Sequence, residues 1–115
     1  MERYLEMIGR VLEQARLRMY EPRKEILEVL PKGFKLWHCR KEPGWKPREI
    51  VDLVEYLYEH TKLVERRISG SAIWKMENGT GEYSLKVLLQ YAYILNVSSL
   101  PLEQIEKMDD DNEDK

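Results

Sequence analysis

The chain has 115 residues, of which 43% are hydrophobic and 35% charged, and its formal net charge is −2. This composition is typical of one small globular domain with a charged surface, and it excludes a largely disordered polymer. The single cysteine excludes an intramolecular disulfide, and apolar runs of only a few residues exclude a membrane-spanning helix.

The charge is unevenly distributed along the chain. Residues 109–115 hold five acids and one base, so the first 108 residues carry a net charge of +2. Residues 32–48 contain six basic residues and one acidic residue. This distribution permits a nucleic-acid partner without requiring one. His38, Cys39 and the distant His60 do not supply the four donors of a structural zinc site, so we expect no metal and no cofactor. Charges interrupt the first 18 residues, unlike a signal peptide, and a cytoplasmic protein is expected.

Two helices are predicted in the N-terminal third. The first, over residues 2–19, has one apolar stripe: Tyr4, Leu5, Ile8, Val11, Leu12, Ala15 and Met19. The second, over residues 23–30, follows Pro22 and ends before Pro31 and Gly33. The stripe has two interpretations, as a dimer surface or as a cover for the core of the following domain.

Residues 34–41 alternate in character and predict a short strand or an extended arm, followed by a turn at Pro43-Gly44. This basic connector carries Trp37 and Trp45. They are interpreted as auxiliary core, with stacking on nucleic-acid bases as the alternative.

Helical spacing resumes after Pro47. One face carries Ile50, Leu53, Val54 and Leu57, and it continues through Thr61, Val64 and Ile68. Ser69 and Ser84 are predicted N-caps of two further helices, which end at Asn78-Gly79 and at Asn96. The second of these carries Leu85, Leu88, Leu89, Ala92 and Leu95. Ser99 and Pro101 open a last short helix with Leu102 and Ile105, and the acidic residues 109–115 predict a disordered tail.

The stretch from Ile73 to Ser98 carries a family pattern. It contains Ile73, then Met76-Glu77-Asn78-Gly79, Ser84-Leu85, Leu88-Leu89, Ala92, Leu95 and Asn96-Val97-Ser98. This register resembles the Xre/Cro family of lambdoid-phage repressors, whose recognition helix ends in Glu-Asn-Gly and whose next helix runs Leu-Leu-x-x-Ala-x-x-Leu. Tyr83 stands where the family usually has Pro, and Asn96 where it has Gly.

The resemblance implies that the helix after Ser69 enters the major groove of DNA. Ile73 and Met76 would then face the core, and the DNA-binding residues would be Ser69, Gly70, Ser71, Trp74, Lys75 and Asn78. Lys75 and Ser71 carry groups that hydrogen-bond base edges, whereas Gly70 has no side chain. Arg66 and Arg67 either neutralise phosphates or form a solvated helix end.

The sequence departs from the family upstream of this helix. Residues 62–68 lack the glycine of the usual turn, and Val64 is bulkier than the family's alanine. Residues 48–67 are therefore also consistent with one long helix that ends in a tight corner at Ile68.

The predicted fold is all-α: residues 1–46 form a helical extension and basic connector, residues 47–108 a five-helix repressor-like helix-turn-helix domain, and residues 109–115 a disordered acidic tail. The expected function is a sequence-specific regulator that binds double-stranded DNA and represses transcription in the manner of the family. As a homodimer it would read two half-sites. One alternative is the antitoxin of a toxin–antitoxin pair, and another is a helix-turn-helix used for protein contacts. No paired carboxylate, activated nucleophile or phosphate loop accompanies Glu77, so an enzyme is not expected.

Overall fold

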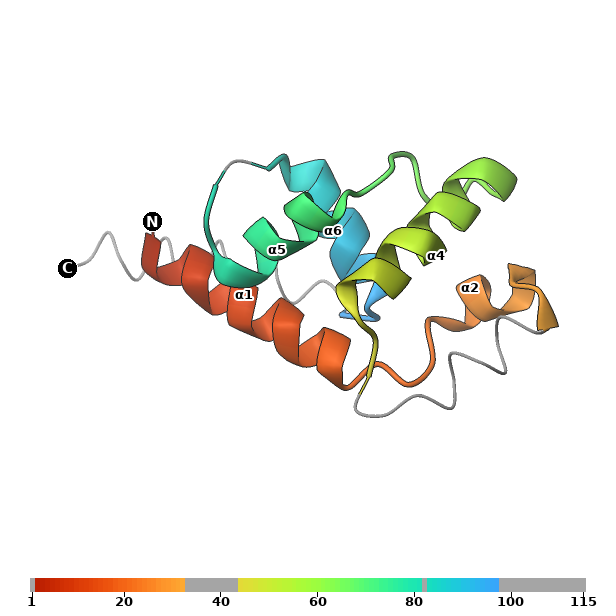
Figure 1. The fold of residues 1–115 in the computed structure, drawn as a ribbon, viewed down its shortest axis with the longest axis horizontal. Coiled ribbons are helices and arrows are strands. Elements are labelled where there is room, and N and C mark those ends of the chain that lie inside the picture. Colours follow the sequence, from red (N-terminus) through yellow and green to blue (C-terminus); the bar gives the residue numbers. More distant parts are fainter. Residues whose placement is uncertain (1, 33–43, 82, 98–115) are drawn as a thin grey trace.

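The computed structural model describes residues 2–32, 44–81 and 83–97. These residues form five helices and no strand, so an all-α fold is confirmed for the described part (Figure 1). The helices are α1 (Glu2–Leu17), α2 (Lys24–Val29), α4 (Pro47–His60), α5 (Gly70–Asn78) and α6 (Leu85–Ile94). The strand expected at 34–41, the helix expected after Ser99 and the acidic tail lie outside the described residues, as do Trp37, His38 and Cys39.

The N-terminal helix α1 packs directly on α5 (Figure 1). Ile8 and Leu12, from the predicted stripe, are buried at this side of α1. A Cβ atom added to Gly9 would lie 2.4 Å from the carbonyl oxygen of Glu77 and 2.9 Å from the nitrogen of Gly79. Only glycine permits such a close approach of the two backbones. Ile8 and Leu12 of the stripe therefore cover the core, as one of its two interpretations predicted.

Helix α2 lies beside α4, and the two are linked by a hydrogen bond from the Tyr56 hydroxyl to the carbonyl oxygen of Val29, at 3.3 Å. Ile26 of α2 is fully buried. Helix α4 begins at Pro47, where the Glu49 carboxylate accepts a hydrogen bond from the backbone N–H of Lys46 at 2.9 Å. A proline in the first helical turn costs no hydrogen bond, because the first N–H groups have no partner within the helix.

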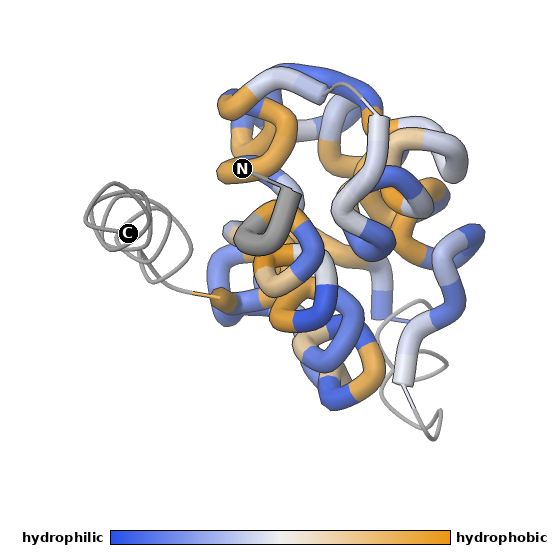
Figure 2. Tube along the Cα trace, turned by 90° about the vertical axis from the view of Figure 1, so that its left-hand side faces the viewer, coloured by the Kyte–Doolittle hydropathy of each residue, from blue (hydrophilic) through white to orange (hydrophobic). Residues whose placement is uncertain are grey.

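A single hydrophobic core joins the two sides of the predicted boundary at residue 46. Ile8, Leu12 and Trp45 belong to the same buried cluster as Ile50 and Leu53. Hydrophobic and hydrophilic segments alternate along the helices, as Figure 2 shows. Trp45 is 1% exposed, which confirms its interpretation as auxiliary core.

The segment between α4 and α5 differs from both arrangements considered for it. Helix α4 ends at His60, and residues 61–69 form neither a second helix nor a continuation of α4. Thr61 has an extended backbone, and its side-chain oxygen accepts a hydrogen bond from the N–H of Leu63 at 3.1 Å. Because a side chain takes up this backbone donor, the helix is not continued. Val64 and Ile68 are nevertheless buried, so the segment contributes to the core without being helical.

Helix α6 confirms the predicted caps but only part of the predicted core face. Ser84 accepts a hydrogen bond from the N–H of Val87 at 3.2 Å, and Asn96 adopts a left-handed conformation with φ of 61°. Leu88, Ala92 and Leu95 are buried as expected, together with Tyr91 and Ile94. Leu85 and Leu89 are instead 51% and 37% exposed.

Candidate nucleic-acid interface

Helix α5 is fixed at both ends by hydrogen bonds that the sequence predicts. The Ser69 side chain accepts a hydrogen bond from the N–H of Ala72 at 3.1 Å. At the other end Gly79 has φ of 66°, and the N–H groups of Gly79 and Thr80 donate to the carbonyls of Met76 and Lys75. This is the Schellman arrangement, which satisfies the last carbonyls of a helix. The two ends of α5 are therefore fixed by its own sequence.

One face of α5 is buried and the opposite face is open. Ile73 and Met76 are 0% exposed, as predicted, whereas Trp74 is 60% exposed. Gly70, Ser71 and Asn78 are also exposed. Residues three and four apart share a helix face, so Ser71, Trp74 and Asn78 form one continuous surface. We call Gly70, Ser71, Trp74, Lys75 and Asn78 the α5 face.

Two members of the α5 face are held by contacts within the protein. The Asn78 side chain donates a hydrogen bond to the carbonyl oxygen of Trp74 at 2.9 Å. The aliphatic stem of Lys75 lies over Gly81, because a Cβ atom there would be 2.7 Å from Lys75 Cδ. Lys75 as a whole is half-buried, and its aliphatic stem takes part in this contact.

The two arginines before α5 have different surroundings. Arg67 turns toward α4, where its guanidinium lies 3.1 Å from Glu55, 3.3 Å from Glu59 and 4.9 Å from the centre of the Tyr58 ring. The side chain of Arg66 is exposed, and its backbone is held by another element. Arg66 and the α5 face are thus neighbours in the chain, but Arg67 is directed to α4.

Gln90 of α6 holds the connection that leads into α5. Its side-chain oxygen accepts hydrogen bonds from the N–H groups of Glu65 at 2.9 Å and Arg66 at 3.2 Å, and its amide nitrogen donates to the carbonyl of Arg66. A side-chain amide used in this way replaces the hydrogen bonds of a helix or strand. Sequence reasoning missed this role, because nothing local indicates a partner 25 residues away.

A buried polar network holds the C-terminal half of α5. The Glu77 carboxylate pairs with the Arg16 guanidinium of α1 and accepts a hydrogen bond from the Tyr91 hydroxyl of α6 at 2.9 Å. Arg16 also donates to the carbonyl of Trp45. Burial and the neighbouring Glu77 carboxylate raise the pKa of Tyr91 far above its ordinary value. Glu77 is therefore bound within the protein by an arginine and a tyrosine.

Neither a metal-binding cluster nor a membrane-spanning helix is found among the described residues. No group of three or more His, Cys, Asp or Glu residues in this part of the chain is arranged to hold a metal ion. None of the described helices has the length and apolar character needed to cross a membrane. His60 stacks on the Tyr56 ring, with ring centres 4.4 Å apart.

Comparison with known proteins adds no relative: no protein-family model, curated protein or solved structure matches the chain.

Proposed function

We propose that this protein is a sequence-specific regulator of transcription that binds double-stranded DNA through the α5 face. The observation that carries the proposal is the contrast between the two sides of α5. Ile73 and Met76 are completely buried, while Trp74 on the other side is 60% exposed. A short helix that is rigidly seated and presents an open polar and aromatic face is the kind of element that enters the major groove.

The chemistry of the α5 face suits the edges of base pairs. The Ser71 hydroxyl can donate or accept a hydrogen bond, and the Lys75 ammonium donates to guanine O6 or N7. The Trp74 ring offers an apolar surface for a thymine methyl group. Gly70 has only one side-chain atom within 4.0 Å of an added Cβ, so its surroundings are open and the backbone there can approach DNA closely.

The flanking arginines supply cations for the phosphates. Arg66 is exposed and lies just before α5 in the chain. Arg67 forms ion pairs with Glu55 and Glu59, and its side chain is still 57% exposed. Exposed ion pairs contribute only about 0–1 kcal/mol, so a phosphate can replace these carboxylates at small cost. Binding at an operator would then block transcription.

Selection of binding sites from random duplex DNA tests the proposal. We expect the wild-type protein to enrich a defined motif, because base contacts from α5 discriminate between sequences. Lys75→Ala should relax the preference at one position of that motif by about 1–3 kcal/mol. Lys24→Ala, which removes an exposed lysine from α2, should leave the motif unchanged. Failure of the wild-type protein to enrich any motif would contradict the proposal.

A second candidate function is a protein-binding module, such as the antitoxin of a toxin–antitoxin pair. The exposure of Trp74 at 60% and Leu85 at 51% favours it, because aromatic residues often carry the binding energy of protein interfaces. Trp74→Ala should then abolish capture of a protein partner encoded next to this chain. Under the DNA-binding proposal the same variant weakens duplex binding instead.

A further inference from the structure

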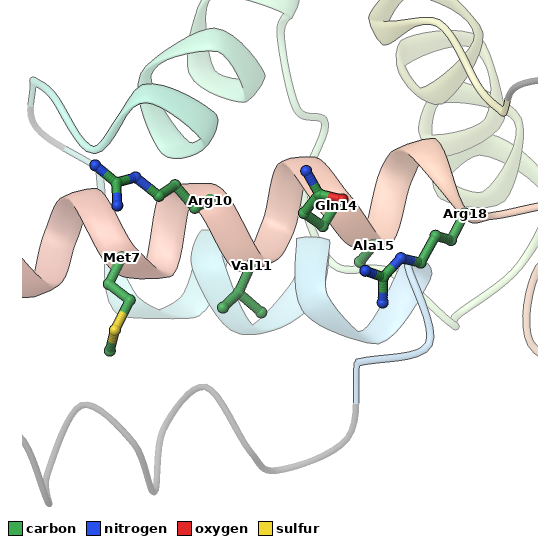
Figure 3. Close-up of a pocket in the computed structure, with 6 residues that line it drawn as sticks. All are labelled: Met7, Arg10, Val11, Gln14, Ala15 and Arg18. Atoms are coloured by element: carbon green, nitrogen blue, oxygen red, sulfur yellow. The ribbon is translucent and has the colours of Figure 1, made fainter.

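A groove runs along α1 on the side away from α5 (Figure 3). It has a volume of about 360 Å³ and is lined by Met7, Arg10, Val11, Gln14, Ala15 and Arg18. Met7, Val11 and Ala15 are half-buried, whereas Ile8 and Leu12 on the inner face of the same helix are buried. The groove therefore has an apolar floor that no described element covers completely.

The rims of the groove are positively charged. Arg10 and Arg18 are exposed and lie eight residues apart, about 12 Å along a helix. The acidic residues Glu6 and Glu13 of α1 lie roughly 150° around the helix from Val11, given 3.6 residues per turn, although each is within one turn of Arg10. Arg18 has no acid three or four residues before it on α1. The groove thus combines apolar and cationic groups and fits a ligand that is apolar along one side and acidic along another.

The chain leaves the described structure at a fixed point, the C-terminal end of α6. Asn96 and Val97 donate hydrogen bonds to the carbonyls of Tyr93 and Ala92, at 3.1 and 2.9 Å. This Schellman arrangement fixes where the chain departs from α6, and α6 is linked to α1 because Tyr91 and Arg16 both bond to Glu77. Val97 packs against the core. The residues that follow Val97 therefore start from a defined point at the end of α6.

The sequence of residues 98–115 matches the groove in charge and in length. Its apolar residues are Leu100, Leu102, Ile105 and Met108, and five acids follow between positions 109 and 114. Eighteen residues span about 27 Å if helical, compared with about 24 Å for the 16 residues of α1. The segment is long enough to cover the groove without strain.

We propose that residues 98–115 of the same chain dock in this groove. Leu102, Ile105 and Met108 contact Met7, Val11 and Ala15, and the acids that follow pair with Arg10 and Arg18. A segment tethered at Val97 has an effective concentration on the order of millimolar, which favours it over a second copy of the chain. If the proposed function holds, docking also keeps the acidic residues on the side of α1 away from the α5 face, where they do not repel phosphates.

A spin label on the tail tests the docking without DNA. In the full chain with Cys39→Ser and Asn112→Cys, we attach a nitroxide and record NMR spectra with the label oxidised and reduced. Docking predicts strong paramagnetic broadening of the signals of Val11 and Ala15, unchanged on dilution, and little broadening at Ser71. Arg10→Glu with Arg18→Glu should relieve most of it, and so should Ile105→Ser. The matched reversals Lys24→Glu with Arg48→Glu, away from the groove, should not.

Three outcomes would overturn the docking proposal. The first is the absence of broadening at Val11 and Ala15. The second is broadening that disappears on dilution and that also appears in the signals of protein without a spin label when spin-labelled protein is added. This result would assign the groove to a second copy of the chain. The third is equal broadening in the charge-reversed and wild-type chains. Because none of these measurements uses DNA, their failure is distinguishable from failure of the proposed function.

Discussion

At the scale of single residues, Glu77 has the role that most changes the interpretation of the sequence. Its side chain is 8% exposed, and it bonds to Arg16 of α1 and Tyr91 of α6. A buried charge is tolerated when it is paired and hydrogen-bonded, and it becomes costly when a partner is removed. The Glu-Asn-Gly sequence at the end of α5 therefore joins three helices in addition to ending one of them.

Glu77→Gln should destabilise the protein by about 3 kcal/mol, because it leaves the Arg16 guanidinium buried without a counter-charge. Urea denaturation monitored by circular dichroism measures this change. Glu55→Gln is a suitable control, since Glu55 is 43% exposed in its pair with Arg67 and should cost less than about 1 kcal/mol. Equal effects of the two variants would show that the buried network contributes no more than a surface ion pair.

Tyr91 gives the protein a dependence on alkaline pH. Its pKa is raised in the folded state by burial and by Glu77. The unfolded chain therefore releases the tyrosine proton first, near the ordinary pKa of about 10. Stability is fully present below this pH and should fall above it, by about 1.4 kcal/mol per pH unit for one proton.

Tyr91→Phe should remove this share of the slope when the free energy of unfolding is measured between neutral and strongly alkaline pH. Tyr83, whose pKa is raised by burial, contributes in the same direction and remains in both proteins. Identical slopes for the two proteins would contradict the buried position of the Tyr91 hydroxyl.

At the scale of helices, local patterns predicted those elements whose hydrogen bonds are local. The caps at Ser69 and Ser84 and the left-handed Asn96 were predicted from the sequence and are present. The segment 61–69 was predicted wrongly, because its backbone is bound by Gln90 from α6. A sequence pattern that is helical in spacing cannot show that a distant side chain will take up the backbone donors.

Gln90→Ala should release the segment before α5. We expect the amide protons of Glu65 and Arg66 to exchange with solvent much faster, because they lose their acceptor. The global cost should be about 1–3 kcal/mol. Lys86→Ala, one turn earlier on α6, is the control, and hydrogen exchange followed by NMR resolves the two amides. Unchanged exchange at both positions would mean that Gln90 does not hold this segment.

The contact between α1 and α5 depends on a small residue at position 9. Gly9→Ala should destabilise the protein by more than about 1 kcal/mol, because the new methyl group would overlap the backbone at Glu77 and Gly79. Gly70→Ala is the matched substitution in open space, and it should be neutral or stabilise by up to about 1 kcal/mol. Thermal unfolding of both variants compares them, and a tolerated Gly9→Ala would show that the helices pack less closely than described.

At the scale of the whole molecule, the N-terminal segment and the residues after Pro47 share one core. Burial could be predicted well where apolar residues repeat at helical spacing, as at Ile50, Leu53 and Leu57. The exposed members of the candidate site were predicted for the same reason, since they lie opposite Ile73 and Met76. Their individual contacts were not predictable, because they depend on the tertiary structure. Lys75 contacts Gly81, and Arg67 pairs with Glu55 of α4.

The salt dependence of duplex binding tests the central claim most directly. We predict that the logarithm of the affinity for a duplex falls linearly with the logarithm of the salt concentration, with a slope of about −2 for the phosphate contacts of Arg66 and Arg67. Arg66→Ala should reduce the slope by about 1. An affinity for duplex DNA that does not change with salt would contradict the assignment of the α5 face to DNA. So would the absence of measurable affinity for any duplex, even at low salt.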